Sequence, residues 1–169
     1  MSEHRVAQFA ESVEEYGRVH RTTAAEATET IAELIEEPAI GVPVPIEGVS
    51  LSELPVETDP TPAQLEAART GITAAGLGVA SYGTLTIESS PAGEEPTSLF
   101  GDRHVAVVAA SDLVGDMRQA IERIDADVAG DGASTHILAT GPSATADMGE
   151  LAIGVHGPHE VHVVVVTDR

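Results

Sequence analysis

At 169 residues the chain can bury a core of its own, and its length suits a single domain spanning residues 1–169. Its 28 acidic residues outnumber eight basic ones, and the resulting net charge of −20 opposes binding to nucleic acid or to an anionic membrane. Without cysteine or lysine, the chain itself cannot supply a thiolate nucleophile, a cysteine-ligated iron–sulfur cluster or a Schiff base.

The first forty residues show helical and extended patterns in turn. Apolar spacing predicts a helix over residues 3–15, and the polar flanks of residues 16–22 predict an edge strand. Thr23 and Glu26 have the spacing of a capping box and precede a helical apolar stripe. Pro38 ends this second predicted helix.

Proline then shapes the chain. Residues 39–46 have an extended pattern, but their two prolines exclude them from the middle of a sheet. Residues 47–62 are rich in Pro, Glu, Ser and Thr, which indicates either a linker or an acidic surface loop. Thr61 is placed to cap a short helix that extends to Thr70.

The middle of the chain is punctuated by glycine. The stretch GITAAGLGVASYGTLTIES ends in a β-type run, Thr84–Ile87, and a second polar loop (SSPAGEEPTS) follows. His104–Ala109 is the pattern of a buried strand. Residues 112–124 predict a helix that Ser111 or Asp112 caps.

The last third of the chain carries the densest set of turns. A strand is expected over His136–Thr140, then a turn and helix starting at Gly141, then the loop GVHGPH and a final strand, Glu160–Thr167. Strands that alternate with helices predict a three-layer α/β fold: a largely parallel sheet with helices on both faces. The near absence of aromatic residues favours the same fold, because Val, Ile, Leu and Ala must fill the core.

The dispersed acids point to the environment of the protein. They alternate with periodic apolar residues, which indicates a folded domain with a carboxylate surface and not a disordered acidic segment. High salt screens the self-repulsion of such a surface, so we infer a halophilic, archaeal host. No apolar run approaches the roughly 20 residues of a membrane-spanning helix, and the N-terminal residues lack the order of a signal peptide, so a cytoplasmic location is expected.

Three glycine-bearing turns adjoin β-type runs, at residues 81–84, 141–147 and 154–158. Ligands of open α/β sheets bind beyond the carboxyl ends of strands, and the second turn directly follows a predicted strand. Ser143 is placed to cap the next helix, whose exposed N–H groups would attract an anion. A plain helix cap explains the pattern equally well, and no Arg in the turn completes a phosphate clamp.

Three histidines, His156, His159 and His162, recur at every third residue and raise the question of a zinc site. The first falls in a loop and the last in a strand, so the spacing does not bring them to one ion, and no metal site is predicted. An acid–base role for His156, oriented by Asp147 or Glu160, is the catalytic alternative.

At these residues the chain resembles a known family. The run GPSATADMGELAIGVHGPHEVHVVVV looks like the C-terminal signature of the LUD domain, the lactate-utilisation protein C (LutC/YkgG) family. Upstream, GITAAGLGVASYGTL and DRHVAVV resemble that family's glycine-rich stretch and its His-initiated strand. A G-P-S-x-T-A-D segment followed by G-V-H-G-P is specific only as a combination.

The resemblance implies a fold like that of the NagB/RpiA/CoA-transferase superfamily and a role in oxidising L-lactate to pyruvate. It implies no cofactor in this chain, iron–sulfur clusters in LutA- and LutB-like partner proteins, and a small anionic metabolite as ligand; self-association is left open. The ligand-binding positions it suggests are Gly83, Thr84, His104, Gly141, Pro142, Ser143, Thr145, His156 and Gly157. The catalytic candidates, Asp147, His156 and Glu160, rest on their proximity in the sequence. Where the family often carries Asp and Glu, this chain has Gly76 and Ser81, so the resemblance supplies no carboxylate there.

Two further functions remain open from the sequence. One is a stand-alone isomerase- or transferase-like enzyme acting on a sugar phosphate or acyl-CoA, for which fold analogy is a weak argument. The other is a module that binds a small ligand without any chemistry. Lactate utilisation with iron–sulfur partners is the leading hypothesis, because only it rests on a specific combination of motifs.

Overall fold

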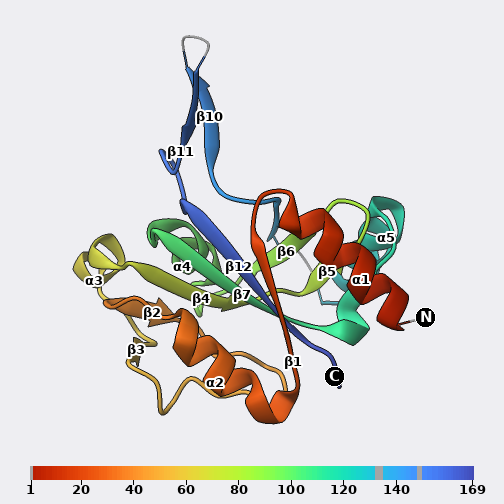
Figure 1. Ribbon diagram of the computed structural model, residues 1–169, viewed down its shortest axis with the longest axis horizontal. Coiled ribbons are helices and arrows are strands. Elements are labelled where there is room, and N and C mark those ends of the chain that lie inside the picture. Colours follow the sequence, from red (N-terminus) through yellow and green to blue (C-terminus); the bar gives the residue numbers. More distant parts are fainter. Residues whose placement is uncertain (1, 132–134, 148–149) are drawn as a thin grey trace.

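The main sheet has six strands, and every neighbouring pair is parallel. The computed structural model describes residues 2–131, 135–147 and 150–169 (Figure 1). In sheet order the strands are β1 (Arg18–Thr22), β12 (Glu160–Val166), β7 (Arg103–Ala109), β4 (Thr70–Ala74), β2 (Ala39–Gly41) and β3 (Val56–Glu57). The central strands are continuous apolar runs because both of their faces are covered.

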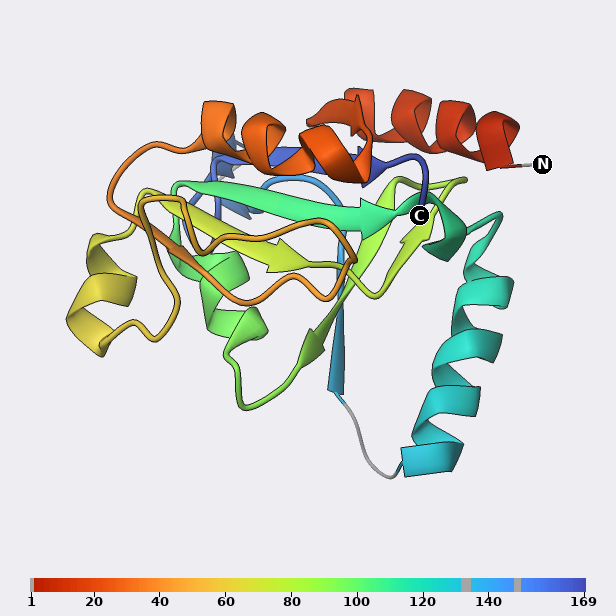
Figure 2. The ribbon, with the colours of Figure 1, turned by 90° about the horizontal axis from the view of Figure 1, so that it is seen from below.

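Helices cover both faces of this sheet. Consecutive strand residues point to opposite faces, and Val163 packs with helix α1 (Ser2–Glu14) while Val164 packs with helix α2 (Ala24–Leu34). Figure 1 shows the two helices on either side of the central strands, and in the view from below in Figure 2 both run along the upper edge. The architecture is therefore the predicted α/β fold with a largely parallel sheet between helices.

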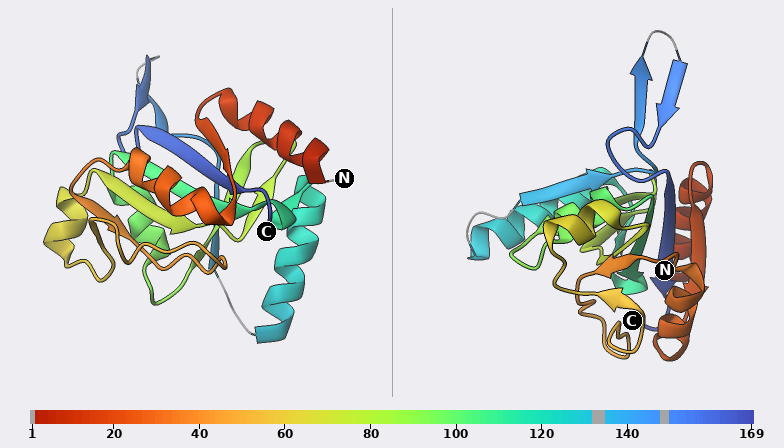
Figure 3. Two further views of the ribbon diagram at one scale, coloured as in Figure 1. Left: turned by 60° about the horizontal axis from the view of Figure 1, so that its bottom comes forward. Right: turned by 90° about the vertical axis from the view of Figure 1, so that its left-hand side faces the viewer.

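A second sheet of four strands packs on the α1 face. Its order is β8 (Leu113–Val114), β5 (Leu77–Val79), β6 (Thr84–Ser89) and β9 (Thr135–Ala139). The remaining elements are α3 (Pro62–Ala67), α4 (Glu94–Phe100), the 3₁₀ turn η1 (Ala110–Asp112), α5 (Met117–Asp131), and a hairpin of β10 (Ala144–Asp147) and β11 (Glu150–Ile153). The hairpin projects from the body of the molecule (Figure 3).

Several predicted elements are confirmed. The helix at residues 3–15, the edge strand within residues 16–22 and the buried strand from residue 104 are α1, β1 and β7. The strands expected from residues 136 and 160 are β9 and β12. These segments have strong periodicity, and each uses it to bury one face or both.

The helix predicted after Gly141 is wrong. The backbone there forms the β10–β11 hairpin, with Ala144 opposite Ile153 and Ala146 opposite Leu151. Gly141 has a left-handed φ of 70°, and the chain then leaves in extended conformation. A four-residue strand alternates over too few residues to be distinguished from the start of a helix. The helix N-terminus expected to attract an anion is therefore absent from this turn.

Several other predictions are corrected. Residues 39–41 form β2, which lies inside the sheet between β4 and β3, because Pro43 and Pro45 come after the last residue of the strand. The helix capped by Thr61 ends at Ala67, and Thr70 already belongs to β4. The polar loop at residues 89–98 contains most of α4, whose buried side chains are the polar Thr97 and Ser98, so no apolar period revealed it.

The helix expected at residues 112–124 starts later. Leu113 and Val114 pair with β5, and α5 begins at Met117, where the Asp116 carboxylate accepts from the Gln119 N–H at 2.9 Å. The segment at residues 47–62 is not a linker, because Val49 and Leu51 are buried against the core under α2, and β3 lies within it.

Helix α2 is capped from the far end of the chain. The Thr23 hydroxyl donates to the Glu26 carboxylate and makes no cap bond to the backbone, contrary to the predicted capping box. The Ala24 N–H instead donates to Asp168 at 2.8 Å. We expect Asp168→Ala to lower the free energy of unfolding by about 1 kcal/mol, the usual cost of a lost cap. Urea denaturation measures this, and exposed Asp59 provides the control: an equal loss from Asp59→Ala would contradict a capping role.

Candidate functional site

Charged residues gather where the parallel strands begin. β7 begins at Arg103 and is directly preceded by Asp102, and β12 begins at Glu160 and is directly preceded by His159. The two strands pair with Arg103 in register with Glu160. An acidic residue therefore faces a basic one at both positions, Asp102 beside His159 and Arg103 beside Glu160. Arg69, just before β4, joins them from the other side of β7.

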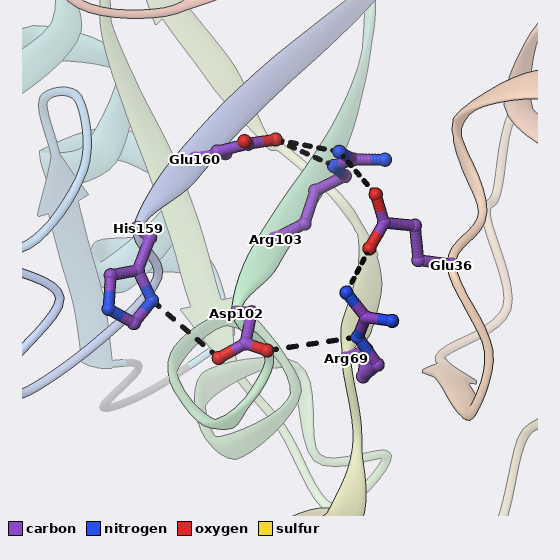
Figure 4. A pocket seen from close by; sticks show the side chains of 6 residues that line it. All are labelled: Glu36, Arg69, Asp102, Arg103, His159 and Glu160. Atoms are coloured by element: carbon purple, nitrogen blue, oxygen red, sulfur yellow. Dashed lines mark hydrogen bonds and ion pairs between the residues drawn. The ribbon is translucent and has the colours of Figure 1, made fainter.

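These side chains form an open ring of ion pairs (Figure 4). Arg103 donates to Glu160 from Nη2 at 2.7 Å and from Nε at 3.0 Å, and to Glu36 from Nη2 at 2.9 Å. Arg69 continues the ring by donating to Glu36 and lies 4.0 Å from Asp102 through Nε. The ring closes toward His159, whose Nδ1 lies 3.6 Å from Asp102 Oδ1.

The two arginines of the ring differ in access. Arg103 is 17% exposed, and its Nη1 also donates to the Leu34 carbonyl, which ties the sheet to the end of α2. Arg69 is 54% exposed and leaves part of its guanidinium to solvent. Arg103 therefore positions its neighbours, and Arg69 is the cation that an external anion can reach.

Three surface hollows meet at His159. The ring surrounds one of about 320 Å³. A second of about 380 Å³, toward Tyr16 and His162, shares His159 and Glu160 with it. A third of about 360 Å³, between Phe100 and the loop at residues 154–157, shares Asp102 and His159. The shared residues make this edge of the sheet the candidate site.

The hydrogen bonds from Arg103 hold the pKa of the Glu160 carboxyl below its usual value. Burial lowers the pKa of His162, and it lowers that of His20, which stacks on His162 with ring centroids 5.3 Å apart. Glu160 thus stays ionised and the histidine pair stays neutral near neutral pH. Such a Glu160 is a fixed negative charge in the site, weak as a proton donor.

The two halves of the family-like signature lie against each other. The Ser143 N–H donates to the Pro158 carbonyl at 2.9 Å, and the Gly154 N–H donates to the Ser143 carbonyl at 2.8 Å. The His156 N–H also lies 3.3 Å from the Ser143 hydroxyl, and Gly157 packs on the Ser143 side chain. This contact fixes the base of the hairpin beside the third hollow, which explains why the two motifs occur together.

A second group of predicted site residues packs around Tyr16. A Cβ at Gly83 would lie 2.2 Å from the Tyr16 hydroxyl and one at Gly141 2.5 Å from its ring, and both glycines have positive φ. Thr84 shares a 2.7 Å hydrogen bond with Thr140. Tyr16 donates to the Tyr82 carbonyl, and burial raises its pKa to about 12. These positions pack α1 and the residues that follow it against the second sheet. Their ligand-binding role stays a prediction.

Other predicted site residues are scattered. His156 is exposed and lines the third hollow, and Pro142 and Thr145 are half-buried at the hairpin. The Asp147 side chain lies outside the described residues, so the predicted pairing of Asp147 with His156 stays a prediction. Glu160, the other carboxylate suggested for His156, is bonded to Arg103 instead. Among the described residues no group of three or more His, Cys, Asp or Glu is arranged to hold a metal ion.

His104 is buried, with 3% of its surface exposed, and its Nε2 lies 2.9 Å from the Thr73 hydroxyl. Burial lowers the pKa of His104 from 6.5 to about 4. In the unfolded chain His104 takes up a proton near pH 6.5, whereas in the folded chain it takes one up only near pH 4. The free energy of unfolding therefore falls as the pH is lowered from about 6.5 to about 4.

Between pH 7 and about pH 4.5, the protonation of His104 should lower the free energy of unfolding of the wild type by about 2–3 kcal/mol. We expect His104→Gln to abolish this part of the pH dependence. Urea denaturation at both pH values, at one salt concentration, measures the difference. His4→Gln, at an exposed position, should leave the pH dependence as it is. If His104→Gln loses as much stability on acidification as the wild type, the assigned shift is wrong.

The sequence did not indicate the ion-pair ring. Its members are Glu36, Arg69, Asp102, Arg103, His159 and Glu160, and the site role of the first four and the place of His159 in the ring were missed. The available signal was the pair DR before one buried strand and HE at the start of another. Strand order was needed to use it, because only adjacent parallel strands align the two pairs. The site lies at the amino ends of the strands of the main sheet. The turn predicted to bind a ligand follows the carboxyl end of β9, but β9 belongs to the second sheet.

Fold and site together define a parallel-sheet α/β domain with a charged groove at the amino ends of its central strands. The chain belongs to the LUD-domain family, whose sequence model matches residues 53–166. Its similarity to named relatives extends over different lengths. A lactate utilization protein C of Deinococcus radiodurans is 29% identical over 168 residues, which cover 94% of this chain and 78% of that protein.

Two lactate utilization C proteins from other bacteria align over a shorter region. The Shouchella clausii protein is 35% identical over 109 residues, and the Bacillus subtilis protein 34% over 107 residues. These alignments cover 63% and 62% of this chain but only 47% and 45% of the relatives. The chain thus aligns with less than half the length of either protein.

A solved structure shares the fold. The crystal structure of a DUF162 family protein from Deinococcus radiodurans superposes with a TM-score of 0.75, covering 98% of both chains at 23% identity. No helix among the described residues is long and apolar enough to cross a membrane.

Proposed function

We propose that this protein acts in lactate utilisation, in a cytoplasmic system that oxidises L-lactate to pyruvate together with iron–sulfur partner proteins. Membership of the LUD-domain family, with relatives named lactate utilization protein C, carries this proposal. The absence of cysteine from this chain supports the assignment of the iron–sulfur clusters to the partner proteins, because such clusters are held by cysteine.

Deletion of the gene in its own host tests the role. We expect the deletion strain to grow normally on pyruvate and to fail on L-lactate as sole carbon source, because only the step between the two is lost. Reintroducing the wild-type gene should restore growth. Equal growth of the deletion strain on both carbon sources would refute the role, and affinity purification in host salt should recover a cysteine-rich partner if the partner proposal is right.

For the ligand we propose a small carboxylate anion bound in the open hollow of about 320 Å³ that the ring lines. The half-exposed guanidinium of Arg69 is the cation available to it, since bidentate pairing is the usual way Arg recognises a carboxylate. His159 lies beside Asp102 and lines all three hollows. In this position it can accept a proton from the part of the ligand that Arg69 does not bind.

Complementation of the deletion strain tests this site. We expect Arg69→Gln and His159→Gln to restore little growth on lactate, while Arg118→Gln restores it fully, because Arg118 lies on the surface of α5, away from the ring, and pairs with Glu122. Protein levels and thermal unfolding should be compared for all three. If Arg69→Gln folds and complements as well as Arg118→Gln, the hollow is not the ligand site.

A further inference from the structure

The β10–β11 hairpin has one wholly apolar face. Residues that pair across antiparallel strands share a face, and so do alternate residues of one strand. Ala144 pairs with Ile153 and Ala146 pairs with Leu151, so these four side chains lie together. The opposite face carries Thr145, Glu150 and Ala152. The ribbon is thus patterned like a strand pair with a core to cover, yet it stands away from the body (Figures 1 and 3).

That apolar face is exposed to solvent. Leu151 is 69% exposed and Ile153 41%, and both alanines are exposed as well. Val155 at the base of the hairpin and Phe100, which both line the third hollow, are also exposed, at 53% and 51%. A two-stranded ribbon is marginal in water by itself, and a contiguous apolar face on a soluble chain marks a contact surface.

The shape of the face is complementary to itself. β10 contributes only alanines, which leave a groove, and β11 contributes Leu and Ile, which form a ridge. When two ribbons meet face to face about a twofold axis parallel to their strands, β11 of each copy lies over β10 of the other. The ridge then fills the groove twice, with Leu151 of one copy over Ala146 of its partner.

Charge favours the same face. Each copy has a net charge of −20, so two copies repel each other over most of their surfaces. The four side chains of the ribbon face are uncharged, so no like charges meet within the contact itself. The parallel arrangement places the two acidic bodies at the same end of the paired ribbons, so salt should strengthen the contact by screening the repulsion between them.

We propose that the β10–β11 hairpin is the contact of a twofold homodimer, in which the apolar faces of two hairpins pack together. Four side chains and a small rim are fewer than the about 20–30 residues per side of a standard interface, so the dimer forms at tens of micromolar or above. Because the hairpin base carries Ser143 and His156, pairing also steadies the wall of the third hollow.

Sedimentation equilibrium over a range of concentrations, in about 0.1 M and about 2 M KCl, tests the contact. We expect a monomer–dimer equilibrium that strengthens at least tenfold in high salt and is abolished by the double variant Leu151→Ser, Ile153→Ser. The control double variant Ile121→Ser, Leu138→Ser removes two other exposed aliphatic side chains, at 50% and 45% exposure, and should dimerise normally. Thermal unfolding of the ribbon variant should match the monomeric wild type, since the ribbon lies outside the core.

Because the chain has no cysteine, single cysteines report the geometry. Mixing the Ala146→Cys and Leu151→Cys variants with a short bismaleimide should yield mainly the mixed cross-linked dimer, with less product from either variant alone. A wild type that stays monomeric at high salt, or a ribbon double variant that dimerises like the wild type, would overturn the proposal. So would aggregates without a two-chain species, or equal cross-linking in mixed and single samples.

Discussion

Gly71→Ala should lower the free energy of unfolding by at least about 3 kcal/mol, at the upper end of the cost of overpacking a core. Gly71 lies in β4 where α4 crosses it, and a Cβ there would lie 2.0 Å from the Thr97 carbonyl oxygen. The obstacle is backbone, so no rotamer change relieves it. The helix must separate from the sheet, and Thr97 and Ser98, which are buried there, must become hydrated.

Urea denaturation of Gly71→Ala and Gly115→Ala at one salt concentration provides the measurement. The nearest atom to a Cβ at Gly115 belongs to the Gln119 side chain at 3.4 Å, an ordinary contact. The control variant should therefore unfold within about 1 kcal/mol of the wild type. Equal losses from the two substitutions would mean that α4 is not packed against β4 as described.

Phe9→Ala should cost about 3–5 kcal/mol, the range for truncating a buried aromatic side chain. Phe9 is fully buried, and its ring lies beside Gly78 of β5, which leaves it room. The other members of its cluster are mostly Val and Ala, and they belong to sheets on two sides, so they cannot move in to fill the cavity. Loss of α1 docking would follow.

The second phenylalanine of the chain supplies the matched control. Phe100 at the end of α4 is 51% exposed, so Phe100→Ala should cost less than about 1 kcal/mol. Denaturation midpoints at equal salt compare the two variants, with a constant m-value as evidence of intact cooperativity. A small loss from Phe9→Ala would show that α1 contributes little to the fold.

How far the sequence predicts the fold depends on the length and burial of each element. α1, α2 and the central strands β7 and β12 are long enough for their periodicity to be read, and their types were predicted correctly. The β10–β11 hairpin and α4 were missed because four to seven residues do not establish a period. In α4 the buried side chains are polar, which hides the pattern completely.

The candidate site was predictable in part. The G-P-S and G-V-H-G-P motifs were predicted to form the site together, and the structure brings them into contact through Ser143 and Pro158. Their role at that contact is to fix the hairpin base. The ion-pair ring could not be predicted, because Glu36, Arg69 and Arg103 are separated by more than thirty residues at each step.

By itself, the sequence determined the fold class, the family, the acidic surface and the exclusion of thiol and lysine chemistry, because these follow from composition and from long periodic or specific patterns. Only the tertiary structure decided which edge of the sheet holds the charged groove. Strand order places Arg103 beside Glu160 and Arg69 beyond β7, and ion pairs a few ångströms long exist only once those strands are adjacent. Only the structure, too, showed that the segment after Gly141 is a hairpin with one apolar face exposed, since pairing and not spacing makes it a ribbon.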